Sequence, residues 1–346
     1  MGFLFAFRSL IRTFAKRNLK NYELMTIIIR KCNASCLALC REASFLLLFF
    51  FLLPTFTGNE ASAQMLVGSY NIRYQNKDDN ERGNSWKQRC PVICDQVNFL
   101  APDIFGAQEV LHPQLLDLLQ GLDGYDYIGV GRDDGKTEGE YAAIFYKKDH
   151  IRLLDNGNFW LSETPEKPSL GWDAACIRIC TWGKFKNMKT KKKFFFFNLH
   201  MDHVGTTARR EAAKLVVQRI REIAKGAPVI LTGDFNVDQN NEIYRIFTES
   251  GILKDSYLTT RLRFAKTGTF NSFKPDLFTT SRIDHVFVSP QTRVDAYGVL
   301  TDAYWTPDST SVDKQKAADA PQEISFSRYQ RRLPSDHYPV FIRIAK

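Results

Sequence analysis

Six apolar, strand-like runs in this 346-residue chain border on polar or titratable side chains. The bordering residues are Asn71, Gln108-Glu109, His200, Asp234 with Asn236, Asp284-His285 and Asp336-His337. Burying such groups costs several kcal/mol unless they are paired or bind a metal ion. Any one of these positions fits a purely structural role. Their repetition predicts that the strands come together to build one functional site.

The stretch from Leu231 to Asn236 shows this pattern in its shortest form. The apolar run Pro228–Leu231 predicts a buried strand, and Gly233 allows a sharp turn at its end. Asp234 and Asn236 are two residues apart, so on extended chain both side chains point the same way. A carboxylate can accept a proton or hold a metal, and an amide can both donate and accept hydrogen bonds. A simple Asx turn explains the same residues when they are taken alone.

Strand-like runs alternate with amphipathic helices along the rest of the chain, which predicts sheets with helices packed outside them. We expect helices at Trp86–Leu100, Pro113–Gln120, Thr206–Lys225 and Glu242–Ser250. We expect strands at 65–73, 103–107, 125–130, 141–146, 151–160, 176–182, 193–199, 229–231, 282–288, 293–300 and 338–344. No linker or composition break divides residues 64–346, so they are predicted to form a single domain.

The segment Thr301–Pro334 has little hydrophobic periodicity. A loop of this length in a compact domain is usually functional or disordered. Because it leads directly into Asp336-His337, we expect it to form a rim of the site.

The amino-terminal 63 residues have the pattern of a secretory signal. The run Ser44–Leu53 is strongly apolar but too short to span a bilayer, basic residues precede it, and Ala61–Ala63 follows it. We expect cleavage before Gln64, a secreted or periplasmic location and no remaining transmembrane anchor. An uncleaved anchor is the alternative, and Met25 is an alternative start.

Four cysteines follow the predicted signal: Cys90, Cys94, Cys176 and Cys180. The first two are expected on a helix and the last two on a strand. We expect free thiols, because strand residues four apart cannot bond to each other. A zinc site is not indicated, since neither pair has histidine partners nearby.

Net charge gives little indication of a polyanionic partner. The chain carries +9, but residues 1–63 contribute five of these charges, with eight basic against three acidic residues. The dense basic cluster Lys189–Lys193 lies between Phe185 and the run Phe194–Phe197. It is therefore expected to form a hairpin turn rather than a nucleic-acid surface.

The six bordering segments, in this order, resemble the motifs of the endonuclease/exonuclease/phosphatase superfamily, over about Met65–Ile344. Three further segments, Gly131–Gly135, Phe159–Pro165 and Gly171–Cys176, resemble those of small secreted bacterial members. The resemblance implies a four-layer α/β/β/α sandwich, in which two mixed sheets lie face to face with helices outside.

The resemblance implies a divalent metal, Mg²⁺ or Mn²⁺. Glu109 corresponds to the main metal carboxylate, with Asn71 and Asp336 nearby. Hard cations of this kind prefer oxygen ligands. Arg73 departs from the pattern, because some relatives carry an acid near this position.

The resemblance also implies catalytic roles for five residues. Asp234 would orient or deprotonate the attacking water, and Asn236 would hold that water and a phosphate oxygen. His337 would stabilise the developing charge or transfer a proton. His200 would be the second histidine, with Asp284 behind it to fix its tautomer.

Four residues are candidate substrate contacts, and three of them have a structural alternative. Arg178 fits a phosphate-binding role or a cross-strand ion pair. Tyr141 fits the edge of the site or the core. Trp172 and Asp173 fit substrate recognition in a loop, and hydrophobic packing is the alternative for the tryptophan.

The sequence therefore predicts a secreted, metal-dependent phosphoesterase that attacks a phosphodiester with an activated water. The substrate classes left open are nucleic acid, a phospholipid head group and a small phosphorylated metabolite. A sphingomyelinase-like or phosphomonoesterase activity is the alternative. A non-catalytic binding module of the same fold is a further alternative, but the complete set of motif residues opposes it. No stable protein partner is implied.

Overall fold

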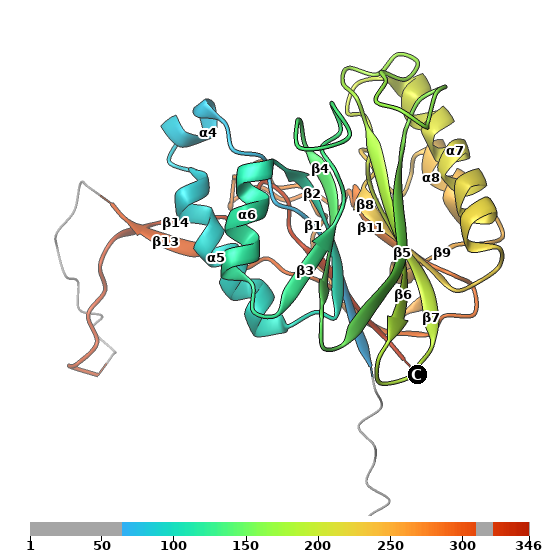
Figure 1. Ribbon diagram of the computed structural model, residues 1–346. Helices are drawn as coiled ribbons and strands as arrows, with labels where there is room; N and C mark the ends of the chain where they lie inside the picture. Colours follow the sequence, from blue (N-terminus) through green and yellow to red (C-terminus); the bar gives the residue numbers. More distant parts are fainter. Residues whose placement is uncertain (1–63, 309–320, 346) are drawn as a thin grey trace, which may run out of the picture. The chain divides into compact units, whose positions relative to one another are not determined.

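A computed structural model describes residues 64–308 and 321–345, in which two mixed β-sheets face each other (Figure 1). The first sheet has the order β10-β12-β15-β1-β2-β4-β3. Its strands are β1 (Met65–Asn71), β2 (Ile104–Val110), β3 (Tyr125–Ile128), β4 (Tyr141–Lys147), β10 (Leu262–Phe264), β12 (Val294–Val299) and β15 (Val340–Ile344). The second sheet has the order β5-β6-β7-β8-β11-β9. Its strands are β5 (Ile151–Trp160), β6 (Ile179–Asn187), β7 (Lys193–His200), β8 (Val229–Asp234), β9 (Lys254–Asp255) and β11 (Asp284–Val288).

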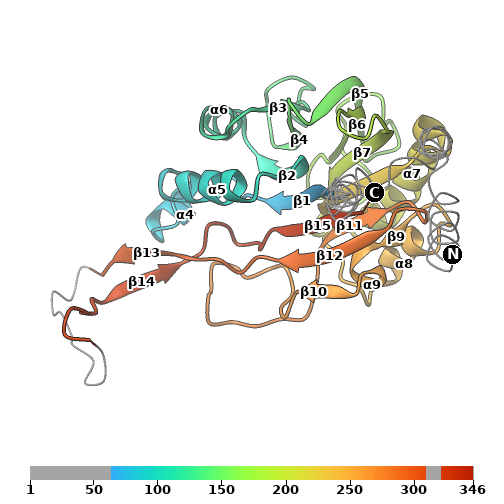
Figure 2. The same ribbon diagram turned by 90° about the horizontal axis from the view of Figure 1, so that it is seen from below.

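Helices cover the outer face of each sheet (Figure 2). They are α4 (Lys77–Glu81), α5 (Trp86–Leu100), α6 (His112–Gly121), α7 (Thr206–Ala224), α8 (Glu242–Thr248) and α9 (Ser256–Thr259). Helices α5 and α6 pack on the first sheet, and α7 and α8 pack on the second. The predicted four-layer α/β/β/α sandwich is thus confirmed.

The four consecutive phenylalanines of β7 show how the sequence builds these layers. Successive side chains of a strand point to opposite faces. Phe195 and Phe197 therefore pack on the α7 side, whereas Phe194 and Phe196 lie between the two sheets. A strand that is apolar on both faces is buried on both, which places β7 in the interior of the sandwich.

Asn198 links the two sheets through a buried polar network. Its Nδ2 donates to the carbonyl oxygens of Ala107 and Ala143, at 2.9 and 2.8 Å. Its Oδ1 accepts from Gln108 Nε2 at 2.6 Å and from Thr232 Oγ1 at 3.0 Å. The amide therefore uses its full hydrogen-bonding capacity inside the core.

Asn198→Ala is expected to lower the free energy of unfolding by about 3 kcal/mol, because it leaves several buried polar groups without partners. Urea denaturation of the purified protein measures this. Asn156→Ala, at an exposed position on β5, is the matched control and is expected to be neutral. A loss below about 1 kcal/mol for Asn198→Ala would show that water or repacking replaces the network.

Strand direction brings the motif residues to one edge of the sandwich. Strands β1 and β2 are parallel, and so are β7 and β8. His200 is therefore level with Asp234, and Asp234 is level with Asp284 across the β8–β11 pair. Because the carboxyl ends of parallel strands meet at one edge, polar residues at the strand ends converge there.

Two expectations for the chain path are wrong. The predicted strand 176–182 begins only at Ile179, so Cys176 lies in the preceding loop. The predicted loop 301–334 contains a two-stranded ribbon, β13 (Tyr304–Pro307) paired with β14 (Tyr329–Arg332). Arg332 fixes this ribbon to the body by donating to Arg82 O and Asn84 Oδ1, each at 3.1 Å. Cross-strand and long-range contacts of this kind leave no periodic trace in the sequence.

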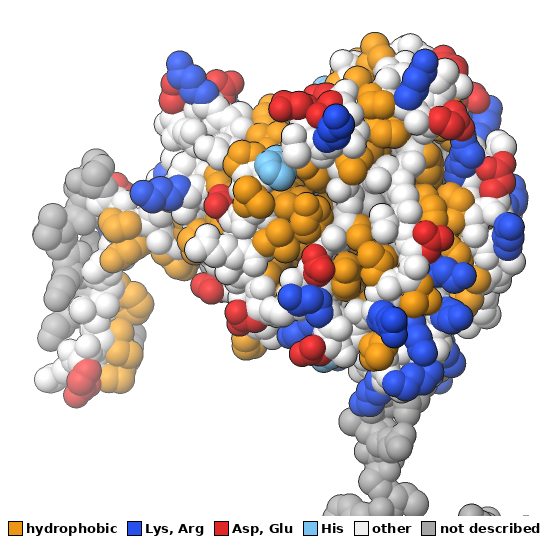
Figure 3. All heavy atoms as spheres, in the orientation of Figure 1, with side chains coloured by type: hydrophobic (Ala, Val, Ile, Leu, Met, Phe, Trp, Pro, Cys, Tyr) orange, Lys and Arg blue, Asp and Glu red, His pale blue; other side chains and the backbone are white. Residues whose placement is uncertain are grey.

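The expected turn at Lys189–Lys193 is confirmed between β6 and β7. In Figure 3, Lys and Arg side chains gather at the lower end of the sandwich, where this turn lies. His200 is at the opposite end of β7, about 23 Å away along the strand. The basic cluster is therefore remote from the motif residues.

The four cysteines are free thiols, as expected. In the described part of the chain, no helix has the length and apolarity needed to cross a bilayer. The predicted signal segment and residues 309–320 of the predicted rim lie outside the described residues.

Candidate active site

Asn71 connects the two carboxylates at the centre of the site. Its Nδ2 donates to Glu109 Oε1 at 2.9 Å and to Asp234 Oδ2 at 3.0 Å. All three side chains are buried. Glu109 and Asn236 both have positive φ angles, 61° and 50°, a conformation that L-residues rarely adopt. Such local strain is typical of residues held in place for function.

His337 is held by Asp284. Its Nδ1 lies 2.8 Å from Asp284 Oδ2, and its Nε2 lies 3.6 Å from Asp234 Oδ2. Burial alone would lower the pKa of His337, but the carboxylates of Asp284 and Asp234 raise it well above its usual value. His337 is therefore an imidazolium at neutral pH. The expected pairing of Asp284 with His200 is wrong.

His200 has the opposite environment. Burial and the nearby Arg178 lower the pKa of His200 well below its usual value, so the ring is neutral. Its Nε2 lies 3.3 Å from Asn236 Nδ2, which makes Nε2 the acceptor and assigns the proton to Nδ1. Two carboxylates lie near the ring, Asp234 Oδ2 at 3.5 Å from Nε2 and Glu140 Oε2 at 3.7 Å from Nδ1. Two histidines with opposite pKa shifts suit different catalytic roles.

Asn236 presents its amide oxygen to the site. Its Nδ2 donates to Met201 O at 2.9 Å and faces His200, so both of its N–H groups are engaged. Oδ1 remains as an acceptor for a water molecule. Asn236 is therefore better placed to hold the attacking water than to donate to a phosphate oxygen. Both roles had been expected from the sequence.

Asp284→Asn is expected to lower the pKa of His337 and to change that of His200 much less, because Asp284 contacts only the former. The loss of the supporting carboxylate should also lower kcat by about 10²-fold. Nitrogen-15 NMR titration of the histidine rings measures both pKa values. A shifted His200 with an unchanged His337 would contradict the pairing.

Arg73 brings a fixed positive charge to the carboxylates. Its Nε lies 2.8 Å from Asp79 Oδ2, and its Nη1 lies 3.6 Å from Asp336 Oδ2 and 3.9 Å from Glu109 Oε2. The sequence departs from the family pattern at this residue, and here a guanidinium stands beside the metal carboxylates.

The residues present fit a divalent metal ion. Carboxylate oxygens of Glu109 and Asp234 lie within 4.8 Å of each other and of His337, whose imidazolium has no lone pair to offer a metal. Burial, opposed by His337, raises the pKa of Asp234 to about 7. Burial, with a further contribution from Glu109, raises the pKa of Asp336 to about 6 despite His337. Such crowding of buried carboxylates is relieved when a cation binds.

Metal affinity is expected to rise with pH. Because the pKa values of Asp336 and Asp234 are about 6 and about 7, protons compete with the metal below these values. In the metal-free protein, the same raised pKa values mean that the free energy of unfolding falls as pH rises from about 4 through about 7.

Calorimetric titration with Mn²⁺ at about pH 5.5, 6.5 and 7.5 should show about tenfold tighter binding per pH unit. An affinity that does not change with pH would contradict these shifts.

The predicted substrate contacts have mixed outcomes. Arg178 is buried and lines a small hollow together with Arg132 and His200, so it remains a candidate for phosphate binding. Tyr141 borders the same hollow, but its hydroxyl donates to Lys136 O at 2.9 Å and its ring is buried. Of the two interpretations of Tyr141, a core residue therefore fits better than a residue at the edge of the site.

The predicted role of Asp173 is wrong. Its carboxylate accepts from Ala208 N at 2.6 Å and Thr207 N at 3.2 Å, which caps the start of α7. These amide contacts lower its pKa. Trp172 is half-buried against the core on the α7 side, with its backbone N–H bonded to Glu163. Packing therefore accounts for it without a substrate.

Two neighbours of the histidines were not predicted. Arg132 forms a bidentate pair with Glu140, at 2.8 and 2.9 Å. The ring of Phe270 stands edge-on to His337, with centroids 5.0 Å apart. Arg132 lies in the motif segment Gly131–Gly135, so the sequence could have indicated it as a site residue. Phe270 lies in an irregular segment, and only the folded chain brings it to His337.

A second group of possible metal ligands consists of Cys176, Asp202 and His203. Arg178 occupies it, with Nη2 2.9 Å from His203 Nδ1 and Nε 3.4 Å from Asp202 Oδ1. This cation takes the atoms that a metal would need. The group therefore positions Arg178.

The fold and the site agree with the family comparison. The model of the endonuclease/exonuclease/phosphatase family matches residues 68–337, and the chain belongs to this family. Its members are metal-dependent phosphoester hydrolases, and the chain is accordingly an enzyme of this type.

Two solved structures cover most of the chain. A mannosyl-6-phosphatase from Bacteroides thetaiotaomicron is 49% identical, with a TM-score of 0.75, over 82% of this chain and all of that protein. A family member from Bacteroides vulgatus is 37% identical, with a TM-score of 0.68, over 82% of this chain and 98% of that one.

A more distant relative is the 3'-5'-exoribonuclease subunit of the CCR4-Not complex of Debaryomyces hansenii. It is 24% identical over 296 residues, which are 74% of this chain and 35% of that protein. Enzymes named for a monoester and for a diester substrate are thus both among the relatives.

Proposed function

We propose that this enzyme is a divalent-metal-dependent phosphomonoesterase that removes the phosphate from the 6-position of a mannosyl unit. The observation that carries the proposal is the 49% identity to a mannosyl-6-phosphatase over that protein's whole length. The monoester alternative of the sequence analysis is preferred here to the diester. Substrate identity is taken from the relative, whereas the reaction type follows from the site.

The cations at the site suit a phosphate monoester. Such a phosphate carries close to two negative charges at neutral pH and has three terminal oxygens. The imidazolium of His337 adjoins the carboxylate of Asp234, and the buried guanidinium of Arg178 lines the small hollow beside His200. A diester has one charge and two free oxygens, so it would use this arrangement less fully.

The hydrolysis is an in-line attack of water on phosphorus. Glu109, Asn71 and Asp336 would hold the Mg²⁺ or Mn²⁺ ion, which supplies positive charge beside the phosphoryl oxygens. Asp234 accepts a proton from the attacking water while Asn236 Oδ1 orients that water. As the new P–O bond forms, the bond to the sugar oxygen breaks, that oxygen takes a proton from solvent water and leaves as the sugar hydroxyl, and the proton on Asp234 returns to solvent.

The two histidines divide the remaining work. His337, held as an imidazolium by Asp284, donates a hydrogen bond to a phosphoryl oxygen and stabilises its growing charge. His200, which is neutral, accepts from the Asn236 amide and so keeps the amide oxygen turned towards the water. Asp284 keeps the proton on His337, whereas burial and Arg178 keep His200 neutral.

Export from the cytoplasm is part of the proposal. It is supported by the apolar run Ser44–Leu53 and the small residues Ala61–Ala63. Amino-terminal sequencing of the exported protein should give Gln64 as the first residue. An intact amino terminus on the exported protein would contradict cleavage.

The activity is tested with the purified protein and Mg²⁺ or Mn²⁺. The substrates are mannose 6-phosphate, a mannosyl glycan carrying 6-phosphate, bis-p-nitrophenyl phosphate, RNA and plasmid DNA. We expect kcat/KM for the mannosyl monoester to exceed that for each diester by at least about 100-fold, and EDTA to abolish turnover. A preference for any diester would overturn the proposed substrate class.

A further inference from the structure

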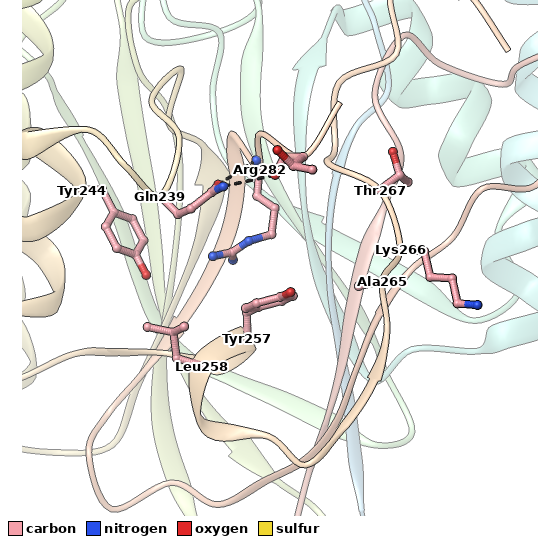
Figure 4. A pocket seen from close by; sticks show the side chains of 9 residues that line it. Gln239, Tyr244, Tyr257, Leu258, Ala265, Lys266, Thr267 and Arg282 are labelled. Carbon is pink, nitrogen blue, oxygen red and sulfur yellow. Dashed lines mark hydrogen bonds between the residues drawn. The ribbon is translucent and has the colours of Figure 1, made fainter. Parts of the chain in front are cut away.

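A cavity of about 340 Å³ lies between α8, α9 and the segments next to β10 and β11 (Figure 4). Its lining includes Gln239, Tyr244, Tyr257, Leu258 and Arg282. The volume falls within the range of small-molecule sites in proteins. None of these residues belongs to the catalytic cluster.

Arg282 dominates the chemistry of the cavity. Its side chain is buried, and Figure 4 shows the guanidinium between Tyr244 and Tyr257. Nη1 pairs with Asp255 Oδ2 at 3.0 Å, and Tyr244 donates to the same oxygen at 2.7 Å. The guanidinium carbon lies 3.9 Å from the centre of the Tyr257 ring. A guanidinium has five N–H groups, so donors remain after the contacts with Asp255 and Tyr297.

The charge inside the cavity is already balanced. Asp255 offsets Arg282, and Lys266 is exposed and directed away from the guanidinium in Figure 4. An anion would therefore have to compete with a buried carboxylate for Arg282. An uncharged ligand with hydroxyl groups can accept from the remaining N–H groups without disturbing this pair.

The aromatic lining fits the apolar part of such a ligand. Tyr257 and Tyr244 line the cavity wall, with the guanidinium groups of Arg282 and Arg263 over the Tyr257 ring at 3.9 and 4.9 Å from its centre. Leu258 adds an apolar side chain that is 60% exposed. Aromatic side chains with a polar tip suit ligands that are apolar on one face and hydroxylated at the edge. Sugar rings have both features.

The wall of the cavity continues into the catalytic site. Its segments 265–267 and 280–282 are joined just beyond it, where Gly268 N donates to Thr279 O at 2.6 Å and Thr269 N to Ser281 O at 3.2 Å. A Cβ on Gly268 would lie 2.0 Å from Ser281 O, so the two segments are closely packed. Thr269 Oγ1 then accepts from Asp284 N at 3.0 Å. The cavity is thus built on the segments that hold the partner of His337.

We infer that this cavity is an accessory site that binds an uncharged hexose unit of the substrate glycan. The identity of the glycan rests on the proposed function, whereas the sugar chemistry rests on the cavity. A hexose bound here would add affinity for a glycan whose phosphorylated unit occupies the catalytic site.

The test is an NMR titration of the purified protein with mannobiose, which carries no phosphate and needs no metal. We expect saturable shifts of the amide signals of Tyr257, Leu258 and Lys266. Leu258→Trp should fill the cavity and weaken binding at least about tenfold. Leu116→Trp, at a similarly exposed leucine on α6, is the matched control and should leave binding unchanged.

Three outcomes would overturn the inference: no saturable shifts, shifts confined to other segments, or equal affinity in Leu258→Trp and the unmodified protein. Hydrolysis of mannose 6-phosphate is measured separately on the same preparations. Mannobiose binding without this hydrolysis would support the cavity as a sugar site and overturn the proposed substrate. Hydrolysis without mannobiose binding would overturn only the cavity inference.

Discussion

Asp234→Asn is expected to lower kcat by about 10³-fold. Asp234 is at the centre of the site, with Asn71 Nδ2 at 3.0 Å and the Nε2 atoms of His200 and His337 at 3.5 and 3.6 Å. Its pKa of about 7 suits a group that accepts a proton near neutral pH. An amide of the same shape cannot accept that proton. Steady-state hydrolysis of mannose 6-phosphate with saturating Mn²⁺ measures the loss.

The control for this change is Asp95→Asn, at an exposed position on α5, which should keep full activity. Circular dichroism and thermal unfolding confirm that both variants are folded. A fall in kcat of less than about tenfold for Asp234→Asn would exclude the carboxylate as the proton acceptor. Another group would then have to activate the water.

Glu109→Gln is expected to weaken Mn²⁺ binding by about 100-fold or more. Loss of a residue that merely supports a metal ligand costs about 10- to 100-fold in affinity, and Glu109 is proposed as a ligand itself. The buried carboxylate accepts from Asn71 Nδ2 at 2.9 Å and from Tyr74 N at 3.1 Å, so its position is fixed from two sides. Glutamine keeps the shape but removes the charge that a divalent ion requires. Calorimetric titration with Mn²⁺ measures the affinity without relying on turnover.

Activity at high metal concentration gives a second measure of the same change. If Glu109 acts through the metal, added Mn²⁺ should restore part of the turnover of Glu109→Gln. Glu138→Gln, at an exposed position, is the control and should bind Mn²⁺ with unchanged affinity. Unchanged Mn²⁺ affinity in Glu109→Gln would remove Glu109 from the metal site and leave Asp234 and Asp336 as the candidate ligands.

The sequence was most informative where a local pattern repeats. Helix α5 was predicted with its observed bounds, Trp86–Leu100, because its apolar positions recur at helical spacing. Strand β5 was likewise predicted as Ile151–Trp160. Short elements such as β9 and α9 were missed, because two to four residues carry no periodic signal.

The structure brings the predicted candidate catalytic residues together, but the pairing of Asp284 with His337 was not predicted. Asp284 is aligned with Asp234 by the antiparallel pairing of β8 and β11. His337 precedes β15, which belongs to the other sheet, and reaches Asp284 only when the two sheets face each other. Asp173 looked like a substrate contact in a loop, but the folded chain places it at the start of α7.

The sequence by itself determined the family, the order of most helices and strands, and the polar side chains that border the strands. It did so because strand periodicity and motif order are local properties of the chain. The tertiary structure alone decided which carboxylate serves which histidine, which arginine adjoins the cluster and where the cavity lies. These depend on strand register and on the packing of two sheets, which join residues far apart in sequence and have no local signature.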